Sequence, residues 1–107
     1  LIPVGYADGW RRGLGNEGSV LIHGKRCPMV GRVCMDQFLV DVTSLEGVAE
    51  GDVATLIGSD GNNSISASDV ALAAGTISWD VLASLQARLP RFYHRAGAVE
   101  ALAPPMW

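Results

Sequence analysis

The sequence predicts a small, mainly β, barrel-like domain that carries two short helices. Short apolar segments separated by glycines and polar turns fill the first half of the chain, and one of them alternates with a period of two. From residue 66 the apolar residues follow a helical spacing, and strand-like segments return after residue 90. A chain of 107 residues suits one domain, so we expect residues 1–107 to form a single unit.

Five segments of the first half are predicted strands. They span residues 2–6, 19–23, 27–34, 37–42 and 53–57. In the fourth segment Phe38, Val40 and Val42 share one strongly apolar face, which indicates a half-buried strand. Gly24 can take a positive φ and is predicted to join the second and third segments in a hairpin. The polar residues 59–64 are predicted to form a loop.

Two short helices and two closing strands are predicted for the second half. Ser66 with Asp69 resembles a helix cap, and Gly75 is a typical end for that helix. Ser78 is predicted to cap a second helix that runs to about residue 88, before Pro90. Residues 91–95 and 98–102 are predicted strands, followed by the helix- and strand-breaking pair Pro104-Pro105.

The composition argues against several classes of protein. The net charge of −3 disfavours nonspecific binding to nucleic acid or to an anionic membrane. No apolar run approaches the roughly 20 residues that span a bilayer, and no basic-then-apolar leader opens the chain, so we expect a soluble, cytoplasmic protein. The first residue is not Met, which suggests a piece of something longer. Cys27 and Cys34 lie on one predicted strand, too far apart for a disulfide.

Two short stretches concentrate polar groups beside glycines. Residues 4–12 combine an aromatic hydroxyl, a carboxylate and two arginines, although the spacing alone favours an Asp-Gly turn with solvent-exposed arginines. Residues 31–37 place a cation, a thiol and a carboxylate around a kink between two strands. The thiol of Cys34 lacks an activating base and is expected to be buried and inert.

Other chemistries find little support in the sequence. Two histidines far apart suggest neither a metal site nor a triad, and each is expected to be structural or exposed. No phosphate-binding glycine loop occurs, which disfavours a nucleotide enzyme. The scattered Asp8, Asp36 and Asp41 are more typical of turns than of a carboxylate pair for glycoside chemistry.

Five ordered blocks that cover nearly the whole chain resemble the alanine racemase family, and in particular its C-terminal β-domain. The blocks are Val4-Gly5-Tyr6-Ala7-Asp8-Gly9, Gly31-Arg32-Val33-Cys34-Met35-Asp36-Gln37, Gly51-Asp52-Val53-Ala54-Thr55-Leu56-Ile57-Gly58, Thr76-Ile77-Ser78-Trp79-Asp80 and Arg88-Leu89-Pro90-Arg91. Their shared order and spacing is a stronger signal than any single motif.

The resemblance implies a parent enzyme that interconverts L- and D-alanine for cell-wall precursors. It implies an N-terminal (β/α)₈ barrel with pyridoxal phosphate on a lysine, and a head-to-tail homodimer in which each barrel meets the β-domain of the other subunit. The cofactor serves as an electron sink while a lysine and a tyrosine move the proton on opposite faces. Neither catalytic base lies in this chain, because the lysine belongs to the barrel and the tyrosine to a segment expected before Leu1. We expect these 107 residues alone to be inactive.

The resemblance also implies roles for residues of this chain. Tyr6, Arg12, Arg32 and Ile77 match residues of the substrate entrance, whereas Met35 matches the residue whose backbone N–H binds the substrate carboxylate, with Asp36 in the same loop. Trp79 departs from the family, which usually has a tyrosine whose hydroxyl reaches the cofactor phosphate. An indole keeps one N–H donor but cannot accept a hydrogen bond. Two alternatives stay open: a broad-specificity or serine-preferring racemase, and a free-standing β-barrel binding module.

Overall fold

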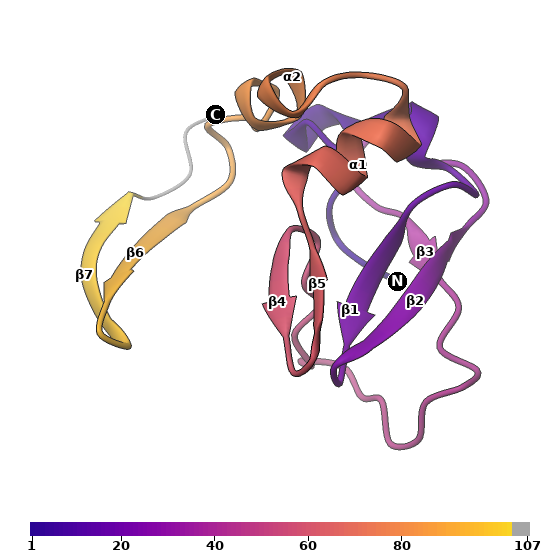
Figure 1. The fold of residues 1–107 in the computed structure, drawn as a ribbon, viewed down its shortest axis with the longest axis horizontal. Coiled ribbons are helices and arrows are strands. Elements are labelled where there is room, and N and C mark those ends of the chain that lie inside the picture. Colours follow the sequence, from indigo (N-terminus) through magenta and orange to yellow (C-terminus); the bar gives the residue numbers. More distant parts are fainter. Residues whose placement is uncertain (104–107) are drawn as a thin grey trace.

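The computed structural model describes residues 1–103, and the predicted breaker pair Pro104-Pro105 lies outside the described residues. The strands are β1 (Ser19–Ile22), β2 (Lys25–Val30), β3 (Leu39–Val40), β4 (Gly58–Asp60), β5 (Asn63–Ile65), β6 (Arg91–Arg95) and β7 (Ala98–Ala103). The α-helices are α1 (Ala67–Ala74) and α2 (Ser78–Ala83), and two single 3₁₀ turns are η1 (Tyr6–Asp8) and η2 (Arg12–Leu14). The prediction of a mainly β chain with two short helices is confirmed (Figure 1).

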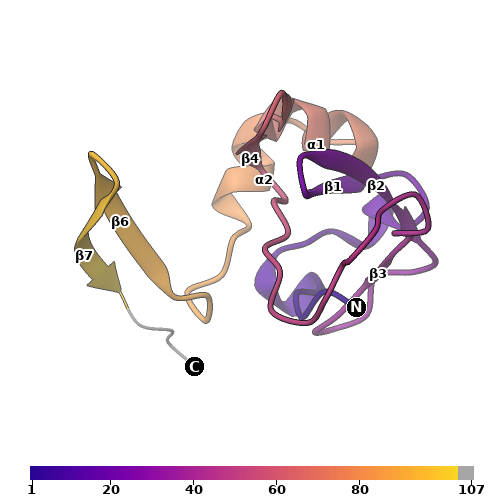
Figure 2. The same ribbon diagram turned by 90° about the horizontal axis from the view of Figure 1, so that it is seen from below.

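The strands form three small antiparallel sheets. β1, β2 and β3 lie side by side in that order, β4 pairs with β5, and β6 pairs with β7. Single bridges between Ile2 and Phe38 and between Leu21 and Thr55 attach two further segments to the first sheet. Within residues 1–103 the sheets do not close into a complete barrel. The helices lie at one end of β1, β2, β4 and β5, while the β6–β7 hairpin stands apart from the rest in both views (Figures 1 and 2).

The core lies between β1, β2 and the two helices. Three of the four residues of β1 are buried, and from β2 Cys27 and Met29 point into the same core. Trp10 stacks on Phe38 with 5.9 Å between the ring centroids, which joins the turn after η1 to the start of β3. Burial of these large side chains stabilises the fold on which the turns rest.

Several predicted strands are shorter than expected. The segment 27–34 is instead Lys25–Val30, because Gly31 has a φ of +79° and turns the chain out of the sheet. In 37–42 only two residues join the ladder, and in 2–6 and 53–57 only single bridges form. Conversely, the predicted loop 59–64 is mostly the hairpin of β4 and β5, which turns at Gly61 with a φ of +60°.

The two helices differ in how well local signals predict them. α1 begins and ends where expected, because Ser66 and Asp69 form a reciprocal capping box and Gly75 takes a left-handed conformation. α2 ends at Ala83, five residues earlier than predicted. The N–H of Gln86 donates to the carbonyl of Asp8 (3.0 Å) instead of to the preceding helical turn. A contact with the other end of the chain therefore stops this helix.

Candidate functional site

The turn that contains Tyr6 is bound directly to the loop that contains Met35. The N–H of Tyr6 donates to the carbonyl of Cys34 (3.0 Å), and the N–H of Ala7 donates to the carbonyl of Met35 (2.9 Å). A Cβ at Gly5 would lie 2.3 Å from the Cys34 carbonyl oxygen, so only glycine permits this approach. Two residues that the sequence separates by 29 positions are thus held as one rigid unit.

Met35 presents a free backbone donor on this unit. The loop closes on itself through a hydrogen bond from the Cys34 N–H to the Gln37 carbonyl (2.9 Å). Among the hydrogen bonds of residues 1–103, none uses the N–H of Met35. Tyr6 and Met35 are 44% and 57% exposed, and Asp36 is exposed as well. The arrangement offers an N–H and a phenol hydroxyl to an anion that approaches from outside.

Arg12 and Arg32 lie on backbone segments that contact each other. A Cβ at Gly15 would lie 2.8 Å from the Gly31 carbonyl oxygen, 3.3 Å from the Cα of Arg32 and 3.4 Å from the Arg12 carbonyl oxygen. Both arginine side chains are exposed. The backbone of η2 therefore lies against the start of the 31–37 loop, so both cationic residues belong to the region around that loop.

The helix α2 supplies the third part of the candidate site. Ile77 at its N-cap and Trp79 in its first turn are 63% and 78% exposed. The neighbouring Asp80 carboxylate instead accepts hydrogen bonds from Thr76 Oγ1 (2.6 Å) and from the guanidinium of Arg11. The Thr76 hydroxyl, with Arg11 contributing further, holds the pKa of Asp80 below its usual range. Arg11 is thus fixed in an ion pair, and the expectation of a merely solvated arginine is wrong.

Asp8 is a residue that sequence reasoning misjudged. It is 3% exposed and is the one buried charged residue among the described side chains. Its carboxylate accepts hydrogen bonds from the Gly5 N–H (2.9 Å) and from Nε of Arg88 (2.8 Å). The expected Asp-Gly turn does form, with Gly9 at a φ of +99°, but its aspartate is buried and paired instead of being an ordinary surface turn residue. The spacing from Gly5 to Asp8 is the local signal for this turn, but the sequence does not reveal its partner 80 positions later.

The remaining sulfur, histidine and acidic groups do not assemble a further centre. Both cysteines are free: Cys27 is buried, which raises the pKa of its thiol, whereas Cys34 is exposed, contrary to expectation. His23 pairs with Asp52 at 2.9 Å, and His94 is exposed, as expected. The described residues contain no group of three or more His, Cys, Asp or Glu side chains able to hold a metal, and none of their helices is long and apolar enough to cross a membrane.

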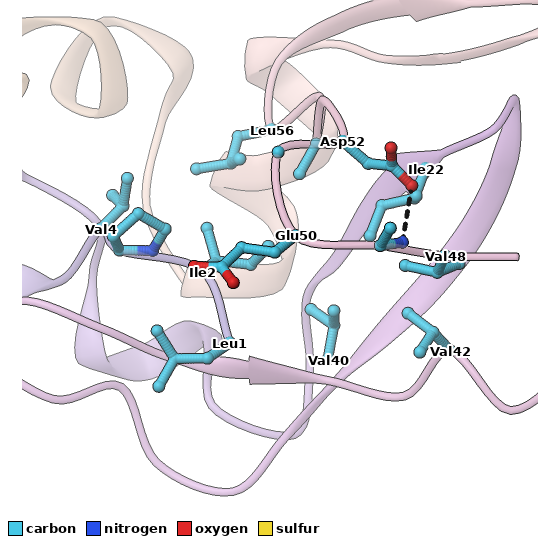
Figure 3. Close-up of a pocket in the computed structure, with 14 residues that line it drawn as sticks. Leu1, Ile2, Val4, Ile22, Val40, Val42, Val48, Glu50, Asp52 and Leu56 are labelled. Atoms are coloured by element: carbon cyan, nitrogen blue, oxygen red, sulfur yellow. Dashed lines mark hydrogen bonds between the residues drawn. The ribbon is translucent and has the colours of Figure 1, made fainter.

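An apolar groove of about 770 Å³ lies elsewhere on the domain. Figure 3 shows its walls, which come from the N-terminal residues Leu1 and Ile2, from Val40 and Val42, and from Leu56. None of the seven predicted site residues lines it. The predicted site is instead a set of exposed groups on η1, η2, the 31–37 loop and α2.

Solved structures with a similar fold are alanine racemases. The fold matches a crystal structure of alanine racemase from Bacillus anthracis with bound L-Ala-P, with a TM-score of 0.84 and 42% identity, covering 94% of this chain and 25% of that one. It also matches alanine racemase from Bartonella henselae with covalently bound pyridoxal phosphate, with a TM-score of 0.68 and 38% identity over 78% of this chain and 23% of that one. Both relatives are racemases, so the fold is that of a racemase domain.

The sequence comparisons specify the domain. Residues 1–93 match the family model of the alanine racemase C-terminal domain. The alanine racemase of Methanococcus maripaludis is 51% identical over 92 residues, which cover 86% of this chain and 24% of that protein. The chain belongs to the alanine racemase C-terminal domain family. It spans about a quarter of the length of the curated relatives that it matches.

Proposed function

We propose that residues 1–107 are the C-terminal β-domain of a longer alanine racemase and supply the substrate-binding half of an active site. The observation that carries this proposal is the free N–H of Met35, fixed beside the exposed Tyr6 on a loop that begins with the exposed Arg32 and packs against the backbone of η2, which carries Arg12. A backbone donor flanked by cations suits the carboxylate of an amino acid. The proton-transferring lysine and tyrosine come from outside this chain.

Each exposed group has a distinct task in this proposal. Arg12 and Arg32 attract the anionic substrate toward the loop, and Tyr6 with Ile77 lines the entrance. The N–H of Met35 then binds the substrate carboxylate. Asp36 follows in the same exposed loop and is the second residue of this chain proposed to bind the substrate.

Pyridoxal phosphate is the cofactor that this function requires. This domain would contact the cofactor without binding it covalently. The only lysine, Lys25, lies at the opposite end of β2 from the loop of Met35, so the covalent lysine must come from elsewhere. The exposed indole N–H of Trp79 is one donor that suits a phosphate oxygen. When bound, the cofactor stabilises the negative charge left at Cα after proton removal.

The proposed partner is the N-terminal barrel of a second subunit in a head-to-tail homodimer. The support is the surface of α1 and α2, where Leu72, Ile77, Trp79 and Leu82 are all at least half exposed. Large exposed apolar side chains on two helices that contact each other favour an interface with another polypeptide. We place the enzyme in the cytoplasm, where it would supply D-alanine for cell-wall precursors.

Trp79 favours a second candidate, a racemase of broad specificity or one that prefers serine. An indole is larger than the phenol usual in the family, and it cannot accept a hydrogen bond. Because Trp79 is exposed in this domain, its main contacts would be made with other parts of the full-length enzyme. A changed pocket wall would alter which substrate side chains fit.

The full-length protein, loaded with pyridoxal phosphate, should be assayed on both enantiomers of alanine, serine and lysine. Racemisation of alanine with the highest kcat/KM supports the first candidate, and a higher value for serine supports the second. A protein that binds the cofactor, shown by its visible absorbance band, and racemises none of these amino acids refutes both. Residues 1–107 alone should show neither the band nor racemisation.

A further inference from the structure

We propose that Asp8 and Arg88 are positioning residues that set the geometry of Tyr6 and of the Met35 N–H, an inference that rests on the proposed function. Their ion pair joins Arg88 Nε to Asp8 Oδ1 at 2.8 Å across 80 positions of the chain. Neither side chain belongs to the exposed groups that would meet substrate. Their effect on substrate would pass through the turn that Asp8 organises.

The first step of the argument is that Asp8 holds the turn of residues 5–9 closed. Its Oδ2 accepts the N–H of Gly5 (2.9 Å), while its own N–H donates to the Gly5 carbonyl (2.9 Å). A buried carboxylate keeps this geometry only while its charge is paired, because an unpaired buried charge is strongly disfavoured. Arg88 supplies the pairing charge.

The second step is that the closed turn fixes the substrate-binding loop. Tyr6 and Ala7, both inside the turn, donate their N–H groups to the carbonyls of Cys34 and Met35. Since the peptide units of the loop are rigid, these two bonds orient the free N–H of Met35 as well. A turn that opened would move Tyr6 and Met35 together.

The third step is that the turn also packs tightly against the segment after α2. The Gln86 N–H donates to the Asp8 carbonyl (3.0 Å), and a Cβ at Gly9 would lie 2.1 Å from the Ser84 carbonyl oxygen. Arg88 therefore belongs to the segment after α2, residues 84–88, against which the turn packs. Without the ion pair, the buried carboxylate would move toward water, and the turn would lose its contacts with the segment after α2.

A purely structural role makes a different prediction. An ion pair that only stabilises the fold would lower the free energy of unfolding without changing how the folded enzyme binds a carboxylate. A positioning pair changes binding in the folded enzyme, and it raises KM more than it lowers kcat because Met35 contacts the carboxylate in both ground and transition states.

The test compares the full-length enzyme with its Arg88→Gln and Asp8→Asn variants, with Ser66→Ala as the control. Ser66 caps α1 and its loss destabilises the fold without touching the turn of residues 5–9. The readouts are kcat and KM for alanine, and the inhibition constant of propionate, which offers a carboxylate without the amino group. We expect KM and the inhibition constant to rise about tenfold in both variants, with kcat within about twofold of wild type. The control should keep wild-type values.

Wild-type KM and propionate values in either folded variant overturn the positioning role, as does a fall in kcat with unchanged KM. Asp8→Asn, which preserves the shape of the side chain, decides the question alone if Arg88→Gln does not fold. Absence of racemisation by the wild-type enzyme would instead refute the proposed function, so the two failures are distinguishable.

Discussion

The guanidinium of Arg11 binds the carboxylate of Asp80, which lies 69 positions later in the chain. The same guanidinium donates to Ser84 Oγ (2.7 Å), so one side chain of the N-terminal region holds both ends of α2. With Asp80 directed toward Arg11 and Thr76, the adjacent Trp79 is left 78% exposed. The polar contacts of Asp80 and Ser84 therefore fix the orientation of α2, and with it the direction in which Trp79 points.

Trp79 should matter for binding and not for folding. Because the indole packs little within the domain, Trp79→Ala should change the free energy of unfolding by less than about 0.5 kcal/mol. In the full-length enzyme, Trp79→Tyr should change the affinity for pyridoxal phosphate and the ratio of alanine to serine rates. Denaturation by urea and a cofactor titration measure these quantities. If Trp79→Tyr left both affinity and rate ratio unchanged, the proposed place of Trp79 beside cofactor and substrate would be wrong.

Gly5 should tolerate no side chain. Its φ of −149° is open to alanine, so the penalty of Gly5→Ala comes from the collision with the Cys34 carbonyl alone. We expect a loss of about 3 kcal/mol in the free energy of unfolding. Gly47→Ala is the control: it meets no atom within 4 Å but has a φ of +71°, and it should cost only about 1 kcal/mol. Equal denaturation midpoints for the two variants would contradict the close approach of turn and loop.

Arg12 should act on the substrate through its charge. Arg12→Gln in the full-length enzyme should lower kcat/KM for alanine by roughly 2- to 10-fold at low ionic strength, and the difference should shrink in 1 M salt. Lys25→Gln removes the same charge at the far end of β2 and should have little effect. Steady-state kinetics at several salt concentrations provide the measurement. A loss that persists undiminished in high salt would argue for a direct contact instead of steering.

Acid should destabilise the domain through hydrogen-bonded aspartates. The pKa of Asp69 is lowered by the Ser66 N–H and that of Asp80 by the Thr76 hydroxyl, and Asp41 and Asp52 are lowered in similar ways. Because the folded pKa lies below the unfolded value of about 4, this stability is fully present well above that value and is lost as pH falls through it and through the folded pKa values. Urea denaturation between about pH 3 and pH 7 should show this decline, and Asp69→Asn should flatten it.

Local signals predicted some elements well and others poorly. The helix α1 was predictable because Ser66, Asp69 and Gly75 act within their own segment. The end of α2 was not, because it depends on the Gln86 bond to Asp8. Similarly, burial of Asp8 depends on Arg88, a partner that no local pattern reveals. The segment that contains Ile2 has the apolar sequence of a strand but pairs through a single bridge. The sequence therefore overestimated the length of such strands.

The candidate site shows the same division. Composition and spacing pointed to residues 4–12 and 31–37 as polar stretches, and the structure joins them through the Tyr6 and Ala7 N–H groups. The individual roles of Tyr6, Met35 and Trp79 came from the resemblance to alanine racemases, because exposed side chains carry no local signature of a site that a second polypeptide region completes.

Exchange of the alanine Cα proton tests the central claim most directly. The full-length protein with pyridoxal phosphate should be incubated with L-alanine in deuterated water, beside residues 1–107 alone with the same cofactor, and followed by NMR and by chiral analysis. The account predicts deuterium at Cα of both enantiomers with the full-length protein, and none with residues 1–107, because both bases lie outside them. Exchange by the 107 residues alone, or no exchange by the cofactor-loaded full-length protein, would contradict it.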